Sequence, residues 1–188
     1  MKWGEFINLS NILSLSRPLL FFPLIALTLL WFHQVFIGAI LYLVGSFTDL
    51  LDGWLARKRN KVTVIGKLLD PLADKLFFDL APFLFYNSLS PFLVHLFAFA
   101  YVPLEGLLLL GGLYAWFFPS QNIFLVGANR GGKWKTACIT IFTILLFSDK
   151  LGVSVPEKYL IMALGFATAL ALVSFVNHIH WEELKKKD

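Results

Sequence analysis

The stretch TDLLDGWLARKRNKVTVIGKLLDPLADKLFFD, residues 48–79, gathers five aspartates, four lysines and two arginines within a chain that is mostly apolar. Asp49 and Asp52 are three residues apart, and Asp70 and Asp74 are four apart. Residues at these spacings share one face of a helix. Apolar runs flank the stretch on both sides, so we expect two antiparallel helices with facing acidic surfaces, joined by a short basic loop.

The composition outside this stretch favours the bilayer as the solvent of the chain. Of 188 residues, 58% are hydrophobic and 15% are charged, with Phe occurring twenty times. Soluble domains usually carry about 25% charged residues, so we expect an all-α integral membrane protein of one domain, residues 1–188. Cys138 is the only cysteine, which excludes an internal disulfide and a cysteine-based zinc site. We attribute the net charge of +4 to cytoplasmic loops and anionic lipid, and expect no nucleic-acid partner.

Six apolar runs suit transmembrane helices, each of which needs about 20 residues. We predict a six-transmembrane-helix bundle within residues 16–178, followed by a cytoplasmic tail at 179–188. Residues 1–15 alternate apolar and polar groups at helical spacing, which indicates an interfacial amphipathic helix; a frayed terminus is the alternative. We expect no cleaved signal peptide. The predicted spans are about 18–32, 36–56, 68–86, 91–118, 134–147 and 159–176.

Basic residues predict the orientation. They cluster at 57–61, 129–135 and 185–187, whereas the opposite loops contain only Lys150 and Lys158. Because cytoplasmic loops carry excess Lys and Arg, we predict six spans with both termini on the cytoplasmic side, in the cell membrane if the organism is prokaryotic.

Clustered carboxylates at membrane depth are costly and usually functional. Divalent cations with oxygen ligands would balance them, and Mg²⁺ in particular also binds substrate phosphates. Arg57 presents a planar fork suited to a pyrophosphate oxygen. Two alternatives stay open from spacing alone: a solvated turn whose acids pair with the basic loop, and a cation pathway or proton relay.

The acidic stretch also has a recognisable pattern. From Asp49 to Asp74 it reads Asp-x-x-Asp-Gly-x-x-Ala-Arg-x(8)-Gly-x-x-x-Asp-x-x-x-Asp. This resembles the signature of the CDP-alcohol phosphatidyltransferase family. Three further stretches resemble its phosphatidylglycerophosphate synthase branch: NILSLSRPLLFFP (11–23), GKLLDPLADKL (66–76) and GKWKT (132–136).

The resemblance implies two divalent ions, Mg²⁺ or Mn²⁺, held by four aspartates. Asp49 and Asp70 would bridge both ions, while Asp52 and Asp74 would each complete one. Asp74 would also be the general base. It would take the proton of an acceptor hydroxyl, which attacks the phosphorus that carries diacylglycerol and releases CMP. Asp79 lies five residues further on, so its spacing places it on another face, where we expect a structural pair or a water-filled cleft and not a catalytic role.

The same resemblance assigns the substrate sites. The residues implied for CDP-diacylglycerol are Gly53, Arg57, Thr63, Asn11 and Ser14. Those implied for the acceptor phosphate are Arg130, Lys133 and Lys135, whose alternative role is contact with lipid headgroups. Arg17 could contact headgroups or substrate phosphate, and the sequence does not decide between them.

The acceptor is the least determined substrate. Related glycerophosphate synthases have an Arg-Glu pair where this chain has Leu104 and Glu105. The resemblance implies transfer from CDP-diacylglycerol to glycerol 3-phosphate, in phospholipid biosynthesis, by a homodimer among membrane lipids. One alternative is cardiolipin synthase, which uses phosphatidylglycerol, or another enzyme of the family with a different acceptor. The competing non-enzymatic class is a small cation or proton transporter.

Overall fold

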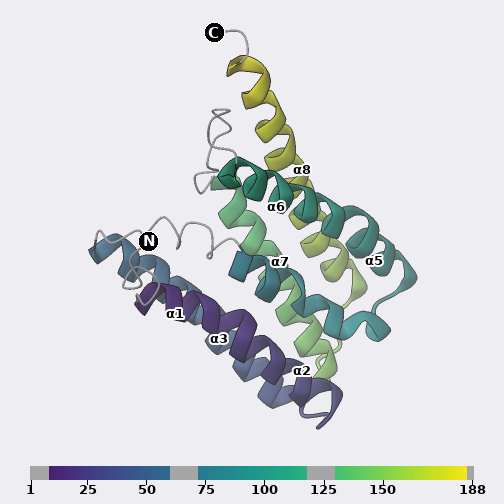
Figure 1. Ribbon diagram of the computed structural model, residues 1–188. Helices are drawn as coiled ribbons and strands as arrows, with labels where there is room; N and C mark the ends of the chain where they lie inside the picture. The colour runs from purple at the N-terminus through teal and green to yellow at the C-terminus, as the bar shows by residue number, and fades with distance from the viewer. Residues whose placement is uncertain (1–8, 60–71, 118–129, 186–188) are drawn as a thin grey trace. The chain divides into compact units, whose positions relative to one another are not determined.

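The computed structural model describes residues 9–59, 72–117 and 130–185 (Figure 1). These residues form helices and short turns, with no strand among them, which confirms the expected all-α class. The chain divides into two compact units: Met1–Phe85 with Leu146–Ser154, and Tyr86–Leu145 with Val155–Asp188. The prediction of one domain over residues 1–188 stays a prediction.

The first unit begins with a helical run that changes geometry at a proline. Helix α1 (Leu9–Ser16) continues without a break into the π-helical η2 (Arg17–Phe21) and then α2 (Phe22–Leu30). Pro18 has no N–H to donate, and the Phe22 N–H donates to the Arg17 carbonyl, five residues back. No turn separates α1 from the first predicted span, and the interfacial helix stays a prediction.

Helix α3 (Val35–Arg59) forms a hairpin with this run. A connection of four residues reverses the chain, with His33 at a positive φ of 53°. The Gln34 N–H then donates to the Thr28 carbonyl at 2.8 Å, which closes the turn. As a result, α3 packs against both α1 and α2 (Figure 1).

The third predicted span is helical but irregular in its described part. Residues 72–74 are α-helical, η3 (Lys75–Asp79) is a π-helix and η4 (Ala81–Ser88) is a 3₁₀ helix. A regular helix over 68–86 was expected. Pro82 interrupts the α-helical hydrogen bonds because it lacks an N–H, and the Phe83 N–H donates instead to the Leu80 carbonyl at 3.0 Å.

Aromatic rings form the core of the first unit. The Tyr42 ring stacks on Phe77 at 5.3 Å between centroids, and Phe78 meets Phe77 edge-on at 5.0 Å. Phe147, at the end of α7 (Arg130–Lys150), packs edge-on against Phe85 at 4.8 Å. All five rings are buried, so this core fixes the approach of α3 to η3.

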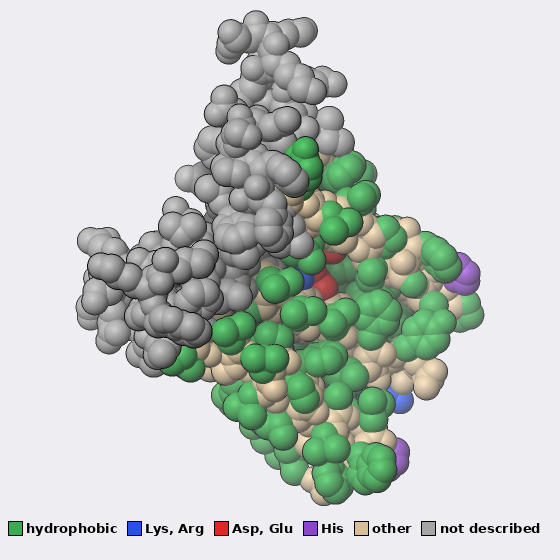
Figure 2. Space-filling model, in the orientation of Figure 1, with side chains coloured by type: hydrophobic (Ala, Val, Ile, Leu, Met, Phe, Trp, Pro, Cys, Tyr) green, Lys and Arg blue, Asp and Glu red, His purple; other side chains and the backbone are tan. Residues whose placement is uncertain are grey.

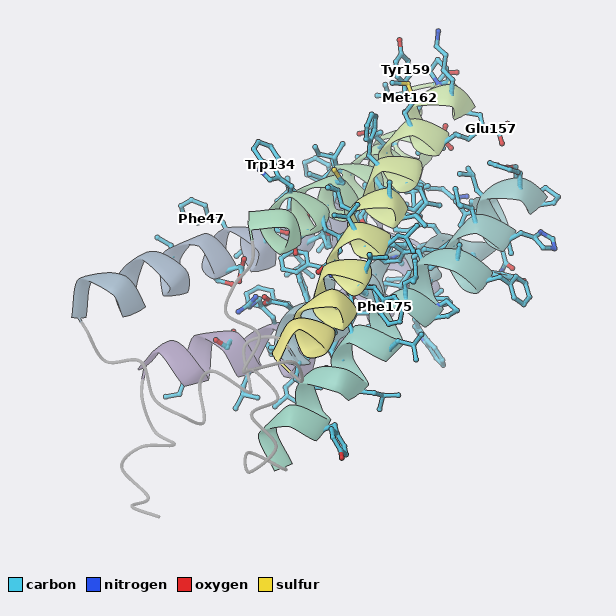
Figure 3. All side chains as sticks on the ribbon, turned by 90° about the horizontal axis from the view of Figure 1, so that it is seen from above. Phe47, Trp134, Glu157, Tyr159, Met162 and Phe175 are labelled. Atoms are coloured by element: carbon cyan, nitrogen blue, oxygen red, sulfur yellow. The ribbon has the colours of Figure 1, made fainter. Side chains whose placement is uncertain are left out.

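The second unit contains the longest apolar helices. Helix α5 (Pro91–His95), η5 (Leu96–Tyr101) and α6 (Val102–Phe117) form one run, against which α8 (Glu157–Lys185) packs. Ser90 caps α5 by accepting from the Leu93 N–H, and its hydroxyl donates to the Glu157 carboxylate. Glu157 lies near Tyr159 and Met162 at the start of α8, and both of these project outward (Figure 3).

Two helical runs in the described residues are long and apolar enough to cross a membrane. They are Pro91–Gly111, with 21 residues, and Glu157–Val176, with 20; Ser14–Leu30 and Val35–Asp49 are shorter apolar helices. Hydrophobic side chains cover much of the described surface visible in Figure 2. Exposed apolar surface on this scale indicates a membrane environment. The count of six spans stays a prediction.

Candidate active site

A buried arginine lies at the centre of the site in the first unit. Arg17 is fully buried at the start of η2. Its Nη1 donates to Asp49 Oδ1 at 2.5 Å and also to Asp74 Oδ1. The carboxyl side chains are 28% and 35% exposed, whereas the Arg17 side chain is 1% exposed. The two carboxylates therefore contact the same buried guanidinium, and their side chains are partly exposed to solvent.

Close helix packing brings the two aspartates together. Asp49 lies one turn after Gly45 on α3, and Asp74 immediately precedes η3, three residues before Phe77. A Cβ atom on Gly45 would lie 2.5 Å from Phe77 Cζ, so only glycine allows this approach. In addition, η2 contacts both α3 and η3. Only Asp49 and Asp74 of the four predicted aspartates are seen to meet in the described residues, so the hairpin of acidic helices stays a prediction.

The predicted metal ligands are described only in part. Asp49 and Asp74 lie together, and Asp52 is one turn further along α3, although its side chain is outside the described part. Asp70 lies outside the described residues. No group of three or more potential ligands occurs among the side chains that are described. The two carboxylates present are hard oxygen donors that suit Mg²⁺ or Mn²⁺, so the described part of the site fits such an ion.

The residues predicted for CDP-diacylglycerol lie on the same elements where they are described. Ser14 is fully buried on α1, one turn before Arg17 and on the same helix face. Asn11 is also on α1, and Gly53 and Arg57 follow Asp52 on α3, but their side chains are not described. Thr63 lies outside the described residues.

The predicted acceptor residues belong to α7, in the second unit. Arg130 begins this helix and Lys133 is in its first turn, both with undescribed side chains. Lys135 Nζ lies 2.6 Å from Glu105 Oε1 and 2.7 Å from Oε2. Glu105 on α6 is 3% exposed. The structure therefore pairs Lys135 with a buried carboxylate, and its role at an acceptor phosphate stays a prediction.

Sequence reasoning missed the aspartate contacts of Arg17. It placed this side chain near headgroups or substrate phosphate, whereas the structure places it against two of the signature aspartates. The available signal was an arginine next to an apolar run, because buried charges in membrane helices are rare and paired. Its partners are 32 and 57 residues away in the sequence, which no local pattern indicates.

Comparison with known proteins identifies the family. The family model described as CDP-alcohol phosphatidyltransferase matches residues 7–175. The chain belongs to this family. Three relatives carry the name CDP-diacylglycerol–glycerol-3-phosphate 3-phosphatidyltransferase. Family membership favours an enzyme over the transporter alternative.

These relatives align over different shares of their length. The protein of Mycoplasma pneumoniae is 34% identical over 154 residues, which are 76% of this chain and 64% of the relative. The chain therefore spans less than two thirds of that protein. The Aquifex aeolicus protein is 34% identical over 71% of this chain and 72% of its own. The Wigglesworthia glossinidia brevipalpis protein is 26% identical over 95% of this chain and 97% of its own length.

Family membership bears on the cofactor and the location. CDP-alcohol phosphatidyltransferases are membrane enzymes that generally depend on a divalent metal. Both properties agree with the apolar helices and the paired carboxylates of this chain.

Proposed function

We propose that this enzyme transfers the phosphatidyl group of CDP-diacylglycerol to glycerol 3-phosphate and releases CMP. The observation that carries the proposal is the meeting of Asp49 and Asp74 at Arg17, since these aspartates begin and end the family signature. The names of the relatives support the substrate pair.

Asp74 is the proposed general base. It accepts the proton of the acceptor hydroxyl, whose oxygen attacks the phosphorus that carries diacylglycerol. A new P–O bond forms, and the P–O bond to CMP breaks. Asp74 suits this role because its side chain is partly exposed and its carboxylate is held by the buried guanidinium of Arg17.

The proposed cofactors are two Mg²⁺ or Mn²⁺ ions, held by Asp49, Asp52, Asp70 and Asp74. When bound, such ions stabilise negative charge on the attacking and leaving oxygens of an in-line displacement. The partial exposure of the Asp49 and Asp74 side chains supports a site for these ions there.

The CDP part of the donor is proposed to lie along α1 and α3. Ser14, buried one turn before Arg17, would present its hydroxyl to the nucleotide beside Asn11. Gly53, without a side chain, would allow close approach, and Arg57 would hold the pyrophosphate. Thr63 completes the proposed set.

The acceptor phosphate is proposed to bind Arg130, Lys133 and Lys135. Glu105 supports this for Lys135, because its buried carboxylate fixes the ammonium position. Leu104, in place of an arginine, favours a second candidate: cardiolipin synthase, whose acceptor is phosphatidylglycerol. That acceptor has no terminal phosphate monoester and needs fewer cations.

We further propose six spans, both termini on the cytoplasmic side, and a homodimer. The basic segments at 57–61, 129–135 and 185–187 support the orientation. This orientation would give the aspartates access to cytoplasmic substrates.

The test is an acceptor screen. Purified protein receives CDP-diacylglycerol and Mg²⁺, and CMP release is measured with glycerol 3-phosphate, with phosphatidylglycerol and without acceptor. We expect CMP release that depends on glycerol 3-phosphate, with phosphatidylglycerophosphate identified by mass spectrometry. Release with phosphatidylglycerol alone would assign the second candidate, and no release with any alcohol would contradict the family activity for this chain.

A further inference from the structure

Arg17 is a charged side chain with almost no exposure to solvent. It lies where α1 becomes π-helical, and such π-turns are frequent at functional sites. Burying a guanidinium is costly unless charged partners compensate it. Here the compensating charges include two residues of the family signature, each on an element other than its own helix.

The exposure of the three side chains determines on which side the guanidinium lies. One nitrogen, Nη1, donates to the Oδ1 atoms of both Asp49 and Asp74. Because the Arg17 side chain is 1% exposed and the side chains of Asp49 and Asp74 are 28% and 35% exposed, Arg17 contacts them from the protein interior. The exposed parts of the Asp49 and Asp74 side chains therefore lie on a side other than the one that Arg17 occupies.

We propose that Arg17 is a positioning residue. Its guanidinium holds Asp49 and Asp74 together from the buried side, so that a divalent cation binds them on the exposed side. This inference rests on the proposed function, because it concerns the carboxylates assigned there to the metal and to proton transfer. It differs from both roles expected from the sequence, contact with headgroups or with substrate phosphate.

Two physical effects of Arg17 on metal binding have opposite signs. Its positive charge repels a cation nearby, which would weaken binding. Its hydrogen bonds keep two carboxylates of separate elements at one place, although their charges repel each other. Loss of hydrogen-bonding partners behind metal ligands typically lowers metal affinity by about 10–100-fold. We therefore expect the positioning effect to be larger than the repulsion. Weaker metal binding after removal of Arg17 would indicate positioning, and tighter binding would indicate repulsion.

The experiment measures Mn²⁺ binding by electron paramagnetic resonance, on purified full-length protein without substrates. Arg17→Met should raise the Mn²⁺ dissociation constant by about 10–100-fold. Lys158→Met is the matched control, since it removes an exposed positive charge on α8 that lies over the Tyr159 ring. This control should bind Mn²⁺ like the wild type.

A second variant keeps the test valid if Arg17→Met fails to fold. Arg17→Lys retains the charge but carries it on a compact ammonium of different shape and position, so a role in charge balance alone predicts unchanged Mn²⁺ affinity. Positioning predicts about tenfold weaker binding, the lower end of the effect usual for such partners. Thermal unfolding and size-exclusion profiles establish that the variants compared are folded. Unchanged or tighter Mn²⁺ binding in folded Arg17→Met or Arg17→Lys would overturn the proposal.

A parallel assay separates this inference from the proposed function. Wild-type protein is assayed for CMP release from CDP-diacylglycerol in the same preparation. Mn²⁺ binding that depends on Arg17, without CMP release from any acceptor, would reject the enzymatic function and support the positioning role. If folded Arg17 variants release CMP and depend on Mn²⁺ concentration as the wild type does, the enzymatic function is supported and the positioning role is rejected.

Discussion

The Gly45→Ala substitution should change the positions of Asp49 and Asp74, although residue 45 is not itself part of the proposed active site. A Cβ atom there would lie 2.5 Å from Phe77 Cζ and 3.1 Å and 3.3 Å from the neighbouring ring carbons. Carbon atoms normally approach to about 3.5–4.0 Å, so Gly45→Ala requires a displacement of about 1 Å. The Phe77 ring is fully buried and packs against Tyr42 and Phe78, so moving it would also disturb those two rings. We expect α3 and η3 to separate instead.

Gly45→Ala should lower the rate of CMP release more than it lowers the free energy of unfolding. Overpacking a core costs about 1–3 kcal/mol, and replacing a helical glycine by alanine returns up to about 1 kcal/mol. The net loss of unfolding free energy should therefore be about 1 kcal/mol. However, Asp49 and Asp74 lie one turn from the two residues that are pushed apart. Misplacement of catalytic groups by about 1 Å can cost about 10²-fold in rate, so CMP release should fall by up to that factor.

The assay compares CMP release and thermal unfolding of Gly45→Ala with those of Gly165→Ala. Gly165 lies in α8, where an added Cβ atom would meet nothing within 4 Å. Alanine there should leave CMP release unchanged and raise stability by up to about 1 kcal/mol. Wild-type CMP release in folded Gly45→Ala would refute the reasoning, because it would show that the approach of α3 to η3 does not set the aspartate geometry.

Three further predictions concern the metal, the acceptor and the topology. EDTA should abolish CMP release, and added Mg²⁺ should restore it; full activity in metal-free buffer would contradict the two-metal proposal. Lys135→Ala should raise the KM for glycerol 3-phosphate by about 10–100-fold, the value of a charge-assisted contact, with little change in the KM for CDP-diacylglycerol. An equal rise in both KM values would instead indicate a structural role for its pair with Glu105. Cysteine probes at positions 60, 122 and 186 should resist labelling from outside, whereas probes at 88 and 152 should react; labelling at 60 would invert the topology.

The sequence predicted the helical class and the meeting of two signature aspartates for a clear physical reason. Hydrophobic runs separated by short polar segments determine helices that must pack as hairpins. Spacings of three and four residues then assign the acidic side chains to one face of each helix. Asp49 and Asp74 do meet, at Arg17, whereas the shared faces with Asp52 and Asp70 stay predictions.

Other features depend on contacts that no local pattern contains. The π-turn at Arg17 and the 3₁₀ segment around Pro82 follow from missing proline donors, but the sequence does not reveal which hydrogen bonds replace them. Lys135 and Glu105 were each noticed, yet their pairing depends on how α6 packs against α7. The residues between α3 and η3 include Asp70 and Thr63, whose predicted roles stay predictions.

The most direct test of the proposed active site is the CMP release of Asp74→Asn beside Asp79→Asn. The asparagine side chain at position 74 keeps a carbonyl oxygen that accepts from Arg17, so the variant should fold, but it cannot take the acceptor proton. Loss of a general base costs about 10²–10⁴-fold, so CMP release should fall by at least that factor while CDP-diacylglycerol still binds. Asp79, at the end of η3, is outside the proposed site, and its variant should retain activity. Near-normal CMP release by Asp74→Asn would contradict the proposed active site.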